Sequence, residues 1–493
     1  MTIIIVLFSF FPAVVVVIAF VVVMVAILII NALRLKTTEV TSPLPPSDAK
    51  GDERSVERFQ AILRLATVWE AELPDPDRKP FDEFLPTLQS LFPRVFENLE
   101  LTIVDTYGIM LRWPGINPEA QPVIFMAHHD VVEADPAGWT HDPFGAEIVD
   151  GRIYARGSVD TKCILAALLE ATDTLLAEGH IPSRDIYLCS SNCEEDMGKT
   201  TPSMVQIFKD RGIEPLLVLD EGGAVIDNAP LGVKQPFAAV GVSEKGVCNV
   251  RIIFDSKGGH ASLPSLENAP SKLVLGLKDM LDNPVPASIS PPVRAMLREL
   301  AALKSFGLRL VFGNLWLFNP LVLRTMKKDP ETAAMVRSTY ALTKLKGGKA
   351  VNVIPKQAEA EINIRIDPLE SVEIVIDRLK ECFAKDVQVV STYESEPSPI
   401  SPFDDEVFAY LRRVIHCVYP EAGIAPYVQS SASDARHFAL ICPHTYRFAG
   451  FLFKTDQRAS VHGQDENLDV ESYVRGVGFY LEFIRNLDML EGQ

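Results

Sequence analysis

The amino-acid sequence predicts an α/β protein with a mixed, mostly parallel sheet that is interrupted by a smaller α+β unit. Three observations predict this class. Short apolar runs alternate with helical patterns along most of the chain, as in βαβ units. Polar residues follow the ends of several apolar runs, where α/β sheets place their sites. An uncharged apolar segment precedes the rest, and 493 residues allow two or three domains with separate cores.

The N-terminal segment is different in kind. Residues 2–33 contain no charged side chain and are rich in Val, Ile, Leu and Phe. As a helix they would extend roughly 48 Å, which exceeds the ~30 Å core of a bilayer. A signal peptide would need a basic start, a shorter apolar run and a small-residue cleavage site, and none of these is clear. We therefore predict an uncleaved single-pass transmembrane helix over residues 1–36, in preference to a buried core helix.

The sequence does not decide on which side of the membrane the body lies. Arg34 and Lys36 follow the apolar segment and nothing basic precedes it, which favours a cytoplasmic body. That rule is weak for a long folded domain that follows one anchor. Residues 37–54 are polar and contain several prolines, so we expect a linker there.

Bulk composition narrows the classes of function. The formal net charge of −18 argues against nucleic acid as a partner, because phosphate binding requires a basic surface. The seven cysteines are scattered and form no Cys-x-x-Cys pair. Neither a thiolate zinc site nor a disulfide framework is therefore indicated.

The body begins with the pattern of a mostly parallel sheet. We predict strands over residues 122–127, 185–190 and 215–219, and a helix over residues 160–177 with apolar residues at helical spacing. After about residue 397, further helices and strands return that would complete the same domain. We place this larger domain at residues 55–243 and 395–493.

A second unit, over residues 244–394, is inserted into the first. Its order is strand, helix, strand, helix, predicted over residues 246–255, 269–281, 359–366 and 371–383. Between them, residues 292–346 are apolar and largely helical. This stretch could pack as core, touch the membrane or wall a hydrophobic substrate channel, and core packing is the plainest of the three.

Polar side chains occupy the predicted strand ends. His128 and Asp130 follow strand 122–127 and point to the same face, since side chains alternate along a strand. An imidazole that binds metal commonly donates its other N–H to a carboxylate, so one strand end could supply both a ligand and its orienting group. By itself, the pattern fits a hydrogen-bonded core histidine at least as well.

Four acidic residues stand at comparable places. Asp160 begins a predicted helix, where it could be an N-cap or a carboxylate that bridges two metal ions. Glu194 and Glu195 follow a strand, and one could bind metal while the other acts as general base. Glu221 follows the next strand and is a further oxygen ligand. For each glutamate alone, an exposed acidic turn is the plain alternative.

The combination favours a metal site. Together with His462, the set gives two imidazoles and three carboxylates as ligands. Two zinc ions need such a set if one carboxylate bridges them and a position stays open for water. The sequence therefore predicts a metal-dependent enzyme.

Motifs at these places recur in a fixed order from about Ser55 to the C-terminus. They are MAHHDVV (126–132), Trp139 with Pro143-Phe144, YARGSVDTK (154–162), Glu194-Glu195, LDEGG (219–223), GGHASLP (258–264) and SDAR (433–436). This set resembles the di-zinc amidohydrolase and peptidase family M-twenty, which includes aminoacylase, glutamate carboxypeptidase and carboxypeptidase S. The N-terminal helix resembles the membrane-anchored branch near carboxypeptidase S and the N-acyl-amino-acid hydrolases.

The resemblance implies a role for each residue of the metal centre. His128 and Glu221 would hold one zinc ion, Glu195 and His462 the other, and Asp160 would bridge them. Asp130 would orient its histidine, and Glu194 would be the general base.

The resemblance also implies residues that bind the substrate. His260, in the inserted lid and dimerisation domain, would stabilise the oxyanion, and in dimeric relatives the corresponding histidine comes from the partner. Asn352, Arg365 and Arg436 match positions that bind the carboxylate and carbonyl oxygen of the substrate. A guanidinium binds a carboxylate bidentately, so a free carboxyl group on the substrate follows on chemical grounds too.

Two departures from the family pattern concern substrate preference. Asn192-Cys193 precedes Glu194 where relatives often have an acidic residue or histidine, and Leu263 replaces a common methionine or serine. Neither change removes a ligand.

The predicted function is zinc-dependent hydrolysis of an amide bond next to a free carboxylate. The enzyme would be a carboxypeptidase on short peptides or an N-acyl-amino-acid amidohydrolase. The apolar stretch at residues 308–323 slightly favours lipophilic N-acyl substrates. The resemblance is also compatible with a homodimer. The rival from another class is a non-catalytic, membrane-anchored binding protein of the same fold. A lost base or ligand would support it, but all five ligand positions, Glu194 and His260 are present.

Overall fold

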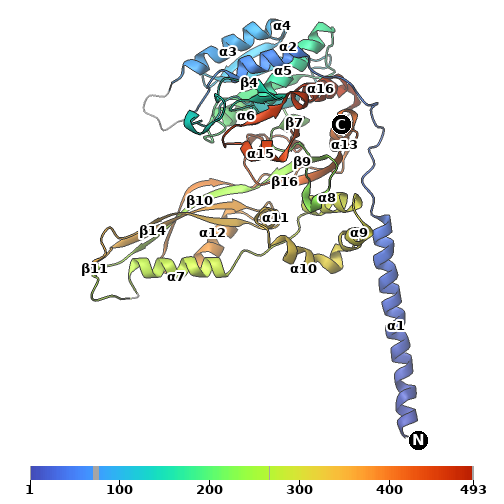
Figure 1. Cartoon of the computed structure of the whole chain (residues 1–493), viewed down its shortest axis with the longest axis vertical. Coiled ribbons are helices and arrows are strands. Elements are labelled where there is room, and N and C mark those ends of the chain that lie inside the picture. Colours follow the sequence, from blue (N-terminus) through green and yellow to red (C-terminus); the bar gives the residue numbers. More distant parts are fainter. Residues whose placement is uncertain (1, 70–76, 266, 491–493) are drawn as a thin grey trace.

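The computed structural model describes residues 2–69, 77–265 and 267–490. Its largest sheet has ten strands, and a separate four-stranded sheet with helices of its own extends from it (Figure 1). The α/β class with a mixed sheet is therefore confirmed.

The ten-stranded sheet decides where the site lies. Its order is β1-β2-β6-β3-β7-β17-β9-β8-β18, with β16 beside β9. The strands are β1 (Glu100–Val104), β2 (Gly108–Trp113), β3 (Val123–His128), β6 (Ile186–Ser191), β7 (Leu217–Asp220), β8 (Val225–Ile226), β9 (Phe237–Glu244), β16 (Gly423–Gln429), β17 (Thr445–Arg447) and β18 (Leu452–Phe453). Strands β6, β3, β7 and β17 run parallel, so their carboxyl ends meet at one edge.

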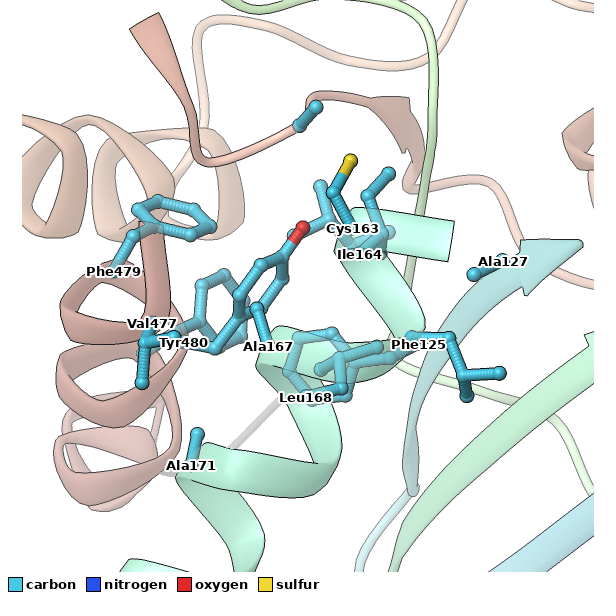
Figure 2. Close-up of a cluster of buried hydrophobic side chains, with 14 of the residues drawn as sticks. Phe125, Ala127, Cys163, Ile164, Ala167, Leu168, Ala171, Val477, Phe479 and Tyr480 are labelled. Atoms are coloured by element: carbon cyan, nitrogen blue, oxygen red, sulfur yellow. The ribbon is translucent and has the colours of Figure 1, made fainter. Parts of the chain in front are cut away.

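Both faces of this sheet are covered by helices. On β3, Phe125 and Ala127 face one core while Ile124 and Met126 face another, which is why the strand is apolar throughout. Figure 2 shows Phe125 and Ala127 against side chains of α5 and α16. The first face is covered by α2 (Glu53–Leu63), α5 (Lys162–Ala177), α13 (Glu406–Val418) and α16 (Val470–Arg485), and the second by α6 (Thr200–Asp210) and α14 (Ala435–Phe438).

Smaller elements surround this sheet. A three-stranded sheet has the order β19-β5-β4. The elements are α3 (Lys79–Leu91), α4 (Pro93–Asn98), β4 (Glu147–Val149), β5 (Arg152–Tyr154), α15 (Thr455–Ser460) and β19 (Asn467–Asp469), with short 3-10 turns at Pro136–Gly138, Pro230–Gly232 and Leu487–Leu490.

The second sheet is antiparallel, with the order β12-β14-β10-β15. It comprises β10 (Gly246–Asp255), β12 (Thr339–Lys346), β14 (Gln357–Ile366) and β15 (Gln388–Ser395), with α7 (Ala269–Asp282) and α12 (Val372–Glu381) packed against it and a two-stranded ribbon of β11 (Gly259–His260) and β13 (Val353–Ile354). We call this unit the lid. Two strands differ from prediction: β12 lies at the end of the stretch expected to be largely helical, and β15 was not predicted. Both are edge strands, whose largely exposed residues give a weak apolar signal.

The rest of the apolar stretch is helical, as expected. It contains α8 (Pro291–Ala302), α9 (Phe306–Gly313), α10 (Leu315–Met326) and α11 (Pro330–Ala334). Side chains from α8, α9 and α10 form a core with residues of β9 and β16, so the stretch joins the lid to the edge of the large sheet.

Helix α1 (Thr2–Arg34) projects away from the body and meets α9 near its C-terminal end (Figure 1). Among the residues that the structure describes, Val15–Arg34 forms a helix long and apolar enough to cross a membrane, a property that signal sequences share.

The segment expected to be a linker lies on the body. The Thr38 N–H donates to the carboxylate of Glu299, and the Ser47 N–H donates to the Cys417 carbonyl at 3.0 Å. The Gly51 N–H donates to the Val474 carbonyl at 2.8 Å. The tether that its prolines suggested is therefore held along its length in this structure.

Candidate metal centre

His128 is the last residue of β3, and its side chain is buried with 1% exposure. Its Nε2 lies 3.0 Å from Oδ1 of Asp160 and 3.5 Å from Oε2 of Glu221. Asp160 comes from the loop between β5 and α5, and Glu221 directly follows β7. Since β3 and β7 are parallel neighbours, the fold brings the two strand ends together.

His462 forms the other side of the cluster. It lies in the loop between α15 and β19, with a left-handed φ of 57°. Its Nε2 is 3.1 Å from Oδ2 of Asp160 and 3.0 Å from Oε2 of Glu195. Asp160 therefore stands between the two imidazoles, with one carboxylate oxygen toward each.

The electrostatics of this cluster reflect crowded carboxylates. Burial raises the pKa of Glu221 to about 8, and the neighbouring Asp160 carboxylate adds to this rise. For Asp160, hydrogen bonds to His128 and His462 outweigh the effect of burial and lower the pKa. Hydrogen bonds to Asp160 and Glu195 raise the pKa of His462 to about 10. Carboxylates gathered between imidazoles are a donor set that fits divalent cations, which would favour their ionised forms.

Glu194 also lies in this cluster. A carboxylate oxygen of Glu194 lies within 4.8 Å of donor atoms of His128 and Glu221, and a second such group joins His128, Asp160 and Glu195. Burial, together with Glu221, raises the pKa of Glu194 well above its usual range. Geometry alone therefore permits Glu194 to be a ligand or to remain free as a base.

The residues around His128 differ in detail from the expectation. Nδ1 of His128 is 2.9 Å from the main-chain oxygen of Asp130 and 3.5 Å from the carboxylate Oδ1. Oδ2 of Asp130 accepts from the Glu195 N–H at 3.1 Å, so this carboxylate also fixes the glutamate turn. His129 points the other way, as the alternation predicts, and stacks on Phe84 at 4.4 Å.

Glu466 is a buried residue that the sequence reasoning missed. Its carboxylate accepts from the backbone N–H groups of Gly157, Val159 and Asp160 at 3.1, 2.7 and 3.1 Å. The Arg156 guanidinium donates to it at 2.6 Å. Glu466 thus fixes the loop that presents Asp160. No local pattern marks it, because its partners lie about three hundred residues earlier in the chain.

Of the two predicted substrate-binding arginines, Arg436 interacts electrostatically with Glu194 of the cluster, and Arg365 interacts with Arg436. Arg436, in α14, is buried, and its Nη1 donates to the Ser433 carbonyl at 2.9 Å. Burial acts to lower its pKa, but Asp434, Glu244 and Glu194 raise it overall. Arg365, on β14, has its pKa lowered by burial, with Arg436 contributing. The two guanidinium groups are therefore within electrostatic reach of each other.

His260 and Asn352 lie elsewhere. His260 is on the β11–β13 ribbon, where the Ala261 N–H donates to the Asn352 carbonyl at 3.1 Å. Figure 1 shows this ribbon at the end of the lid that is remote from the ten-stranded sheet. The His260 side chain is exposed and hydrogen-bonds Oγ of Ser262 at 2.7 Å. In a single chain of this structure, neither residue reaches the metal cluster.

A pocket of about 1020 Å³ opens beside the cluster. Asp160, Glu194, Glu195, Glu221 and His462 contribute to its polar part. Much of the remaining wall is apolar and includes Ile226, Ala229, Phe237, Met296, Met335 and Phe453. Small-molecule sites commonly measure about 300–1,000 Å³, so this one is large.

Comparison with known proteins identifies the class that this fold and cluster define. Residues 124–486 match the model of Peptidase family M20/M25/M40, and the chain belongs to that family. The resemblance noted from the motifs is therefore confirmed. Family membership and the cluster of imidazoles and carboxylates together make the chain a metal-dependent hydrolase of amide bonds.

Particular relatives narrow the class. An N-fatty-acyl-amino acid synthase/hydrolase of Bos taurus is 36% identical over 414 residues, which cover 82% of this chain and 82% of the relative. A probable carboxypeptidase S-like protein of Dictyostelium discoideum is 31% identical over 422 residues, covering 84% and 80%. The crystal structure of an M20 family metallo-carboxypeptidase from Sulfolobus solfataricus shares the fold, with TM-score 0.65, 18% identity and coverage of 90% and 100%.

Proposed function

We propose that this protein is a membrane-anchored di-zinc amidohydrolase that cleaves N-acyl amino acids with a lipophilic acyl group and a free carboxylate. The observation that carries this proposal is the pocket, which combines the acidic metal cluster with a large apolar wall. The name of the Bos taurus relative, an N-fatty-acyl-amino acid synthase/hydrolase, supports the same substrate class.

The arrangement of donors supports two metal ions. His128 and Glu221 would hold one ion, His462 and Glu195 the other, and Asp160, with one oxygen toward each imidazole, would bridge them. Zinc bound there would polarise the scissile carbonyl and lower the pKa of water.

The protein side chains would supply the proton transfer and the orientation. Glu194, held in a buried acidic setting that raises its pKa, would take a proton from the attacking water and deliver it to the leaving amine. Arg365 and Arg436 would bind the free carboxylate of the substrate. Asn352 and His260 would contact the carbonyl oxygen once the lid closes or a second copy supplies them.

A carboxypeptidase acting on short peptides is the second candidate. It uses the same cleavage next to a free carboxylate, and the Dictyostelium discoideum relative carries the carboxypeptidase S name. The two candidates differ only in what fills the apolar part of the pocket.

Retention of α1 as an anchor is supported by contacts of the residues at and beyond its end. Ala32 and Leu35 are buried, and Thr38 is bonded to Glu299. Cleavage in this region would remove part of the packing of the body. We keep the division into a catalytic domain (55–243 and 395–493) and a lid (244–394) as part of the proposal.

The test is hydrolysis by the full chain in detergent micelles. The panel pairs dipeptides with N-fatty-acyl amino acids, each with a free or an amidated carboxyl group. We expect zinc-dependent cleavage of the free-carboxyl N-fatty-acyl substrates and little cleavage of their amides.

Three other results would change the assignment. Preference for dipeptides would select the carboxypeptidase. Equal cleavage of amidated substrates would remove the carboxylate clamp from the proposal. A folded, zinc-loaded chain that cleaves nothing on the panel would favour the non-catalytic binding protein.

A further inference from the structure

Residues 300–328 differ in charge from the rest of the chain. The whole protein has a formal net charge of −18, yet this stretch contains no Asp or Glu. Its charged residues are Lys304, Arg309, Arg324, Lys327 and Lys328. A basic and strongly apolar stretch in an acidic protein points to an anionic, lipophilic contact rather than to general solubility.

Helix α10, within this stretch, is apolar on its outward side as well as its inward side. The inward side packs into the core that it shares with α8 and α9. The outward side presents Trp316, Leu317 and Leu321, which expose 59%, 44% and 55% of their surface. A helix at the surface of a globular protein usually turns polar residues to solvent. Arg324 and then Lys327 and Lys328 follow this apolar surface at the C-terminal end of the helix.

Helix α9 and the turn into α10 are fixed against α1. Gly313 packs so closely that an added Cβ would lie 3.2 Å from the carbonyl oxygen of Asn31. The buried Asn314 accepts from Nδ2 of Asn31 at 2.8 Å and donates to the Leu28 carbonyl at 3.0 Å. The Trp316 Nε1–H donates to the same Asn314 oxygen at 3.3 Å. The apolar side of α10 therefore begins where α1 meets the body (Figure 1).

We propose that α9 and α10 form an interfacial membrane-binding element, which seats the body on the bilayer that holds α1. The outward side of α10 lies among the upper acyl chains, and Arg324, Lys327 and Lys328 contact anionic headgroups. Trp at the membrane interface and a rim of basic residues are typical of such helices. This inference rests on the anchor role proposed above for α1.

Two alternative arrangements fit less well. Helices of 8 and 12 residues are each too short to span the ~30 Å core of a bilayer, and they are bent by 107°. One side of α10 is also committed to the core of the body, so the pair lies on the membrane rather than across it. A second copy that docked through the same surface would bring Arg324, Lys327 and Lys328 of the two chains together, and their like charges would repel.

The position of the element has a consequence for the active site. Met296 of α8 belongs to the core on which α10 rests, and it also lines the pocket beside the metal cluster. The membrane contact thus shares a core with the apolar wall of the pocket. A lipophilic substrate dissolved in the bilayer would be concentrated next to that wall.

The experiment uses the full chain reconstituted into vesicles of phosphatidylcholine and phosphatidylserine. Part of the phosphatidylcholine carries bromine on the upper acyl chain, which quenches tryptophan only at short range. The chain has four tryptophans, and Trp69, Trp113 and Trp139 belong to the catalytic body. We expect quenching in the native chain that is mostly lost in the Trp316→Phe variant.

A matched control and a second variant separate the contact from a folding defect. Trp139→Phe removes a tryptophan of the body and should leave the lipid-dependent quenching unchanged. Leu317→Glu with Leu321→Glu keeps Trp316 and should reduce its quenching, while hydrolysis of a micelle-dispersed substrate persists.

The outcomes distinguish this inference from the proposed anchor. If the chain fails to float with the vesicles, the anchor role of α1 is wrong and the inference falls with it. If the chain floats but its quenching is the same with and without Trp316, the anchor stands and the interfacial element is overturned. If Trp316 is protected from lipid quenching in crowded vesicles, and this protection is lost at one copy per vesicle, a second copy covers the surface. That result would also overturn the proposal.

Discussion

The metal cluster and the lid ribbon hold residues of one proposed reaction, but the protein builds them in opposite ways. In the cluster, the His128 and Glu195 side chains are 1% and 8% exposed, while His462 at its rim is 51% exposed. His128, Glu195 and Glu221 lie at or after the ends of parallel strands of one sheet, and loops bring Asp160 and His462 to them. His260 is exposed on a two-stranded ribbon at the far end of a separate sheet. The donor set is therefore already in place in this structure, whereas the role proposed for His260 would need movement of the lid or a second chain.

The largest expected effect tests the preorganised region. Chelation should remove activity completely, and adding zinc back should restore it, because the cluster loses its Lewis acid while the sheet beneath it stays folded. Metal content, hydrolysis and far-UV circular dichroism are measured together. Full activity in metal-free protein would show that the cluster is not the catalytic centre.

Glu194→Gln should lower kcat by roughly 10²–10⁴-fold while the metal content stays unchanged, because a general base is lost and no ligand is removed. Glu97→Gln, at an exposed position, is the control. Loss of metal from the Glu194 variant would instead make this residue a ligand, which the geometry also permits.

The lid side of the comparison is tested at His260. His260→Ala should lower kcat by about 10²-fold or more, as for loss of an oxyanion donor, without loss of metal. Mixing this variant with Glu194→Gln distinguishes the two routes. Recovered activity shows that His260 acts across a dimer, and no recovery favours closure of the lid in one chain. An unchanged rate in His260→Ala would exclude it from the reaction.

A smaller effect is expected from Glu466→Gln, which tests whether Glu466 positions the loop that presents Asp160. The loop that presents Asp160 would lose charge-assisted bonds from Arg156 and the backbone, so metal affinity should fall by roughly 10–100-fold. Metal titration followed by hydrolysis at saturating zinc separates positioning from catalysis. Glu471→Gln, exposed on α16, is the control, and equal affinity in both variants would remove Glu466 from the site.

The smallest effect on activity is expected for Lys245, which lies where the ten-stranded sheet meets the lid. The measured effect there is on stability. Lys245 lies between β9 and β10, and its Nζ donates to the Ala334 and Arg337 carbonyls at 2.7 Å. Burial lowers its pKa from 10.5 to about 8. Between pH 8 and pH 10.5 the Lys245 amine binds a proton in the unfolded chain but is mostly neutral in the folded chain. The stability contributed by this residue therefore rises with pH.

The free energy of unfolding of the native chain should therefore rise relative to Lys245→Met by on the order of 3 kcal/mol between pH 8 and pH 10.5. Denaturant unfolding at several pH values measures the difference. Lys349→Met, at an exposed position of the lid, should show no such trend. A difference that is flat with pH would mean that Lys245 keeps an ordinary pKa.

Much of the fold was predictable because its strands are apolar throughout or flanked by clear turns. The strand predicted over 246–255 has those bounds in the structure, and the helix predicted over 160–177 begins two residues later, at Lys162. The exposed edge strands β12 and β15 lack this signal. The contacts of the predicted linker with the body could not be predicted, because hydrogen bonds such as Ser47 to Cys417 join residues remote in the sequence.

The sequence by itself determined the kind of chemistry, because His128, Glu195 and Glu221 lie at or after the ends of parallel neighbouring strands whose carboxyl ends meet at one sheet edge. It also determined the apolar helix and the basic, apolar stretch, which depend on composition alone. Only the tertiary structure decided that Glu466 holds the Asp160 loop, that His260 lies far from the cluster, and that α10 starts beside α1. These relations join distant residues, and local periodicity carries no information about which distant surfaces will pack together.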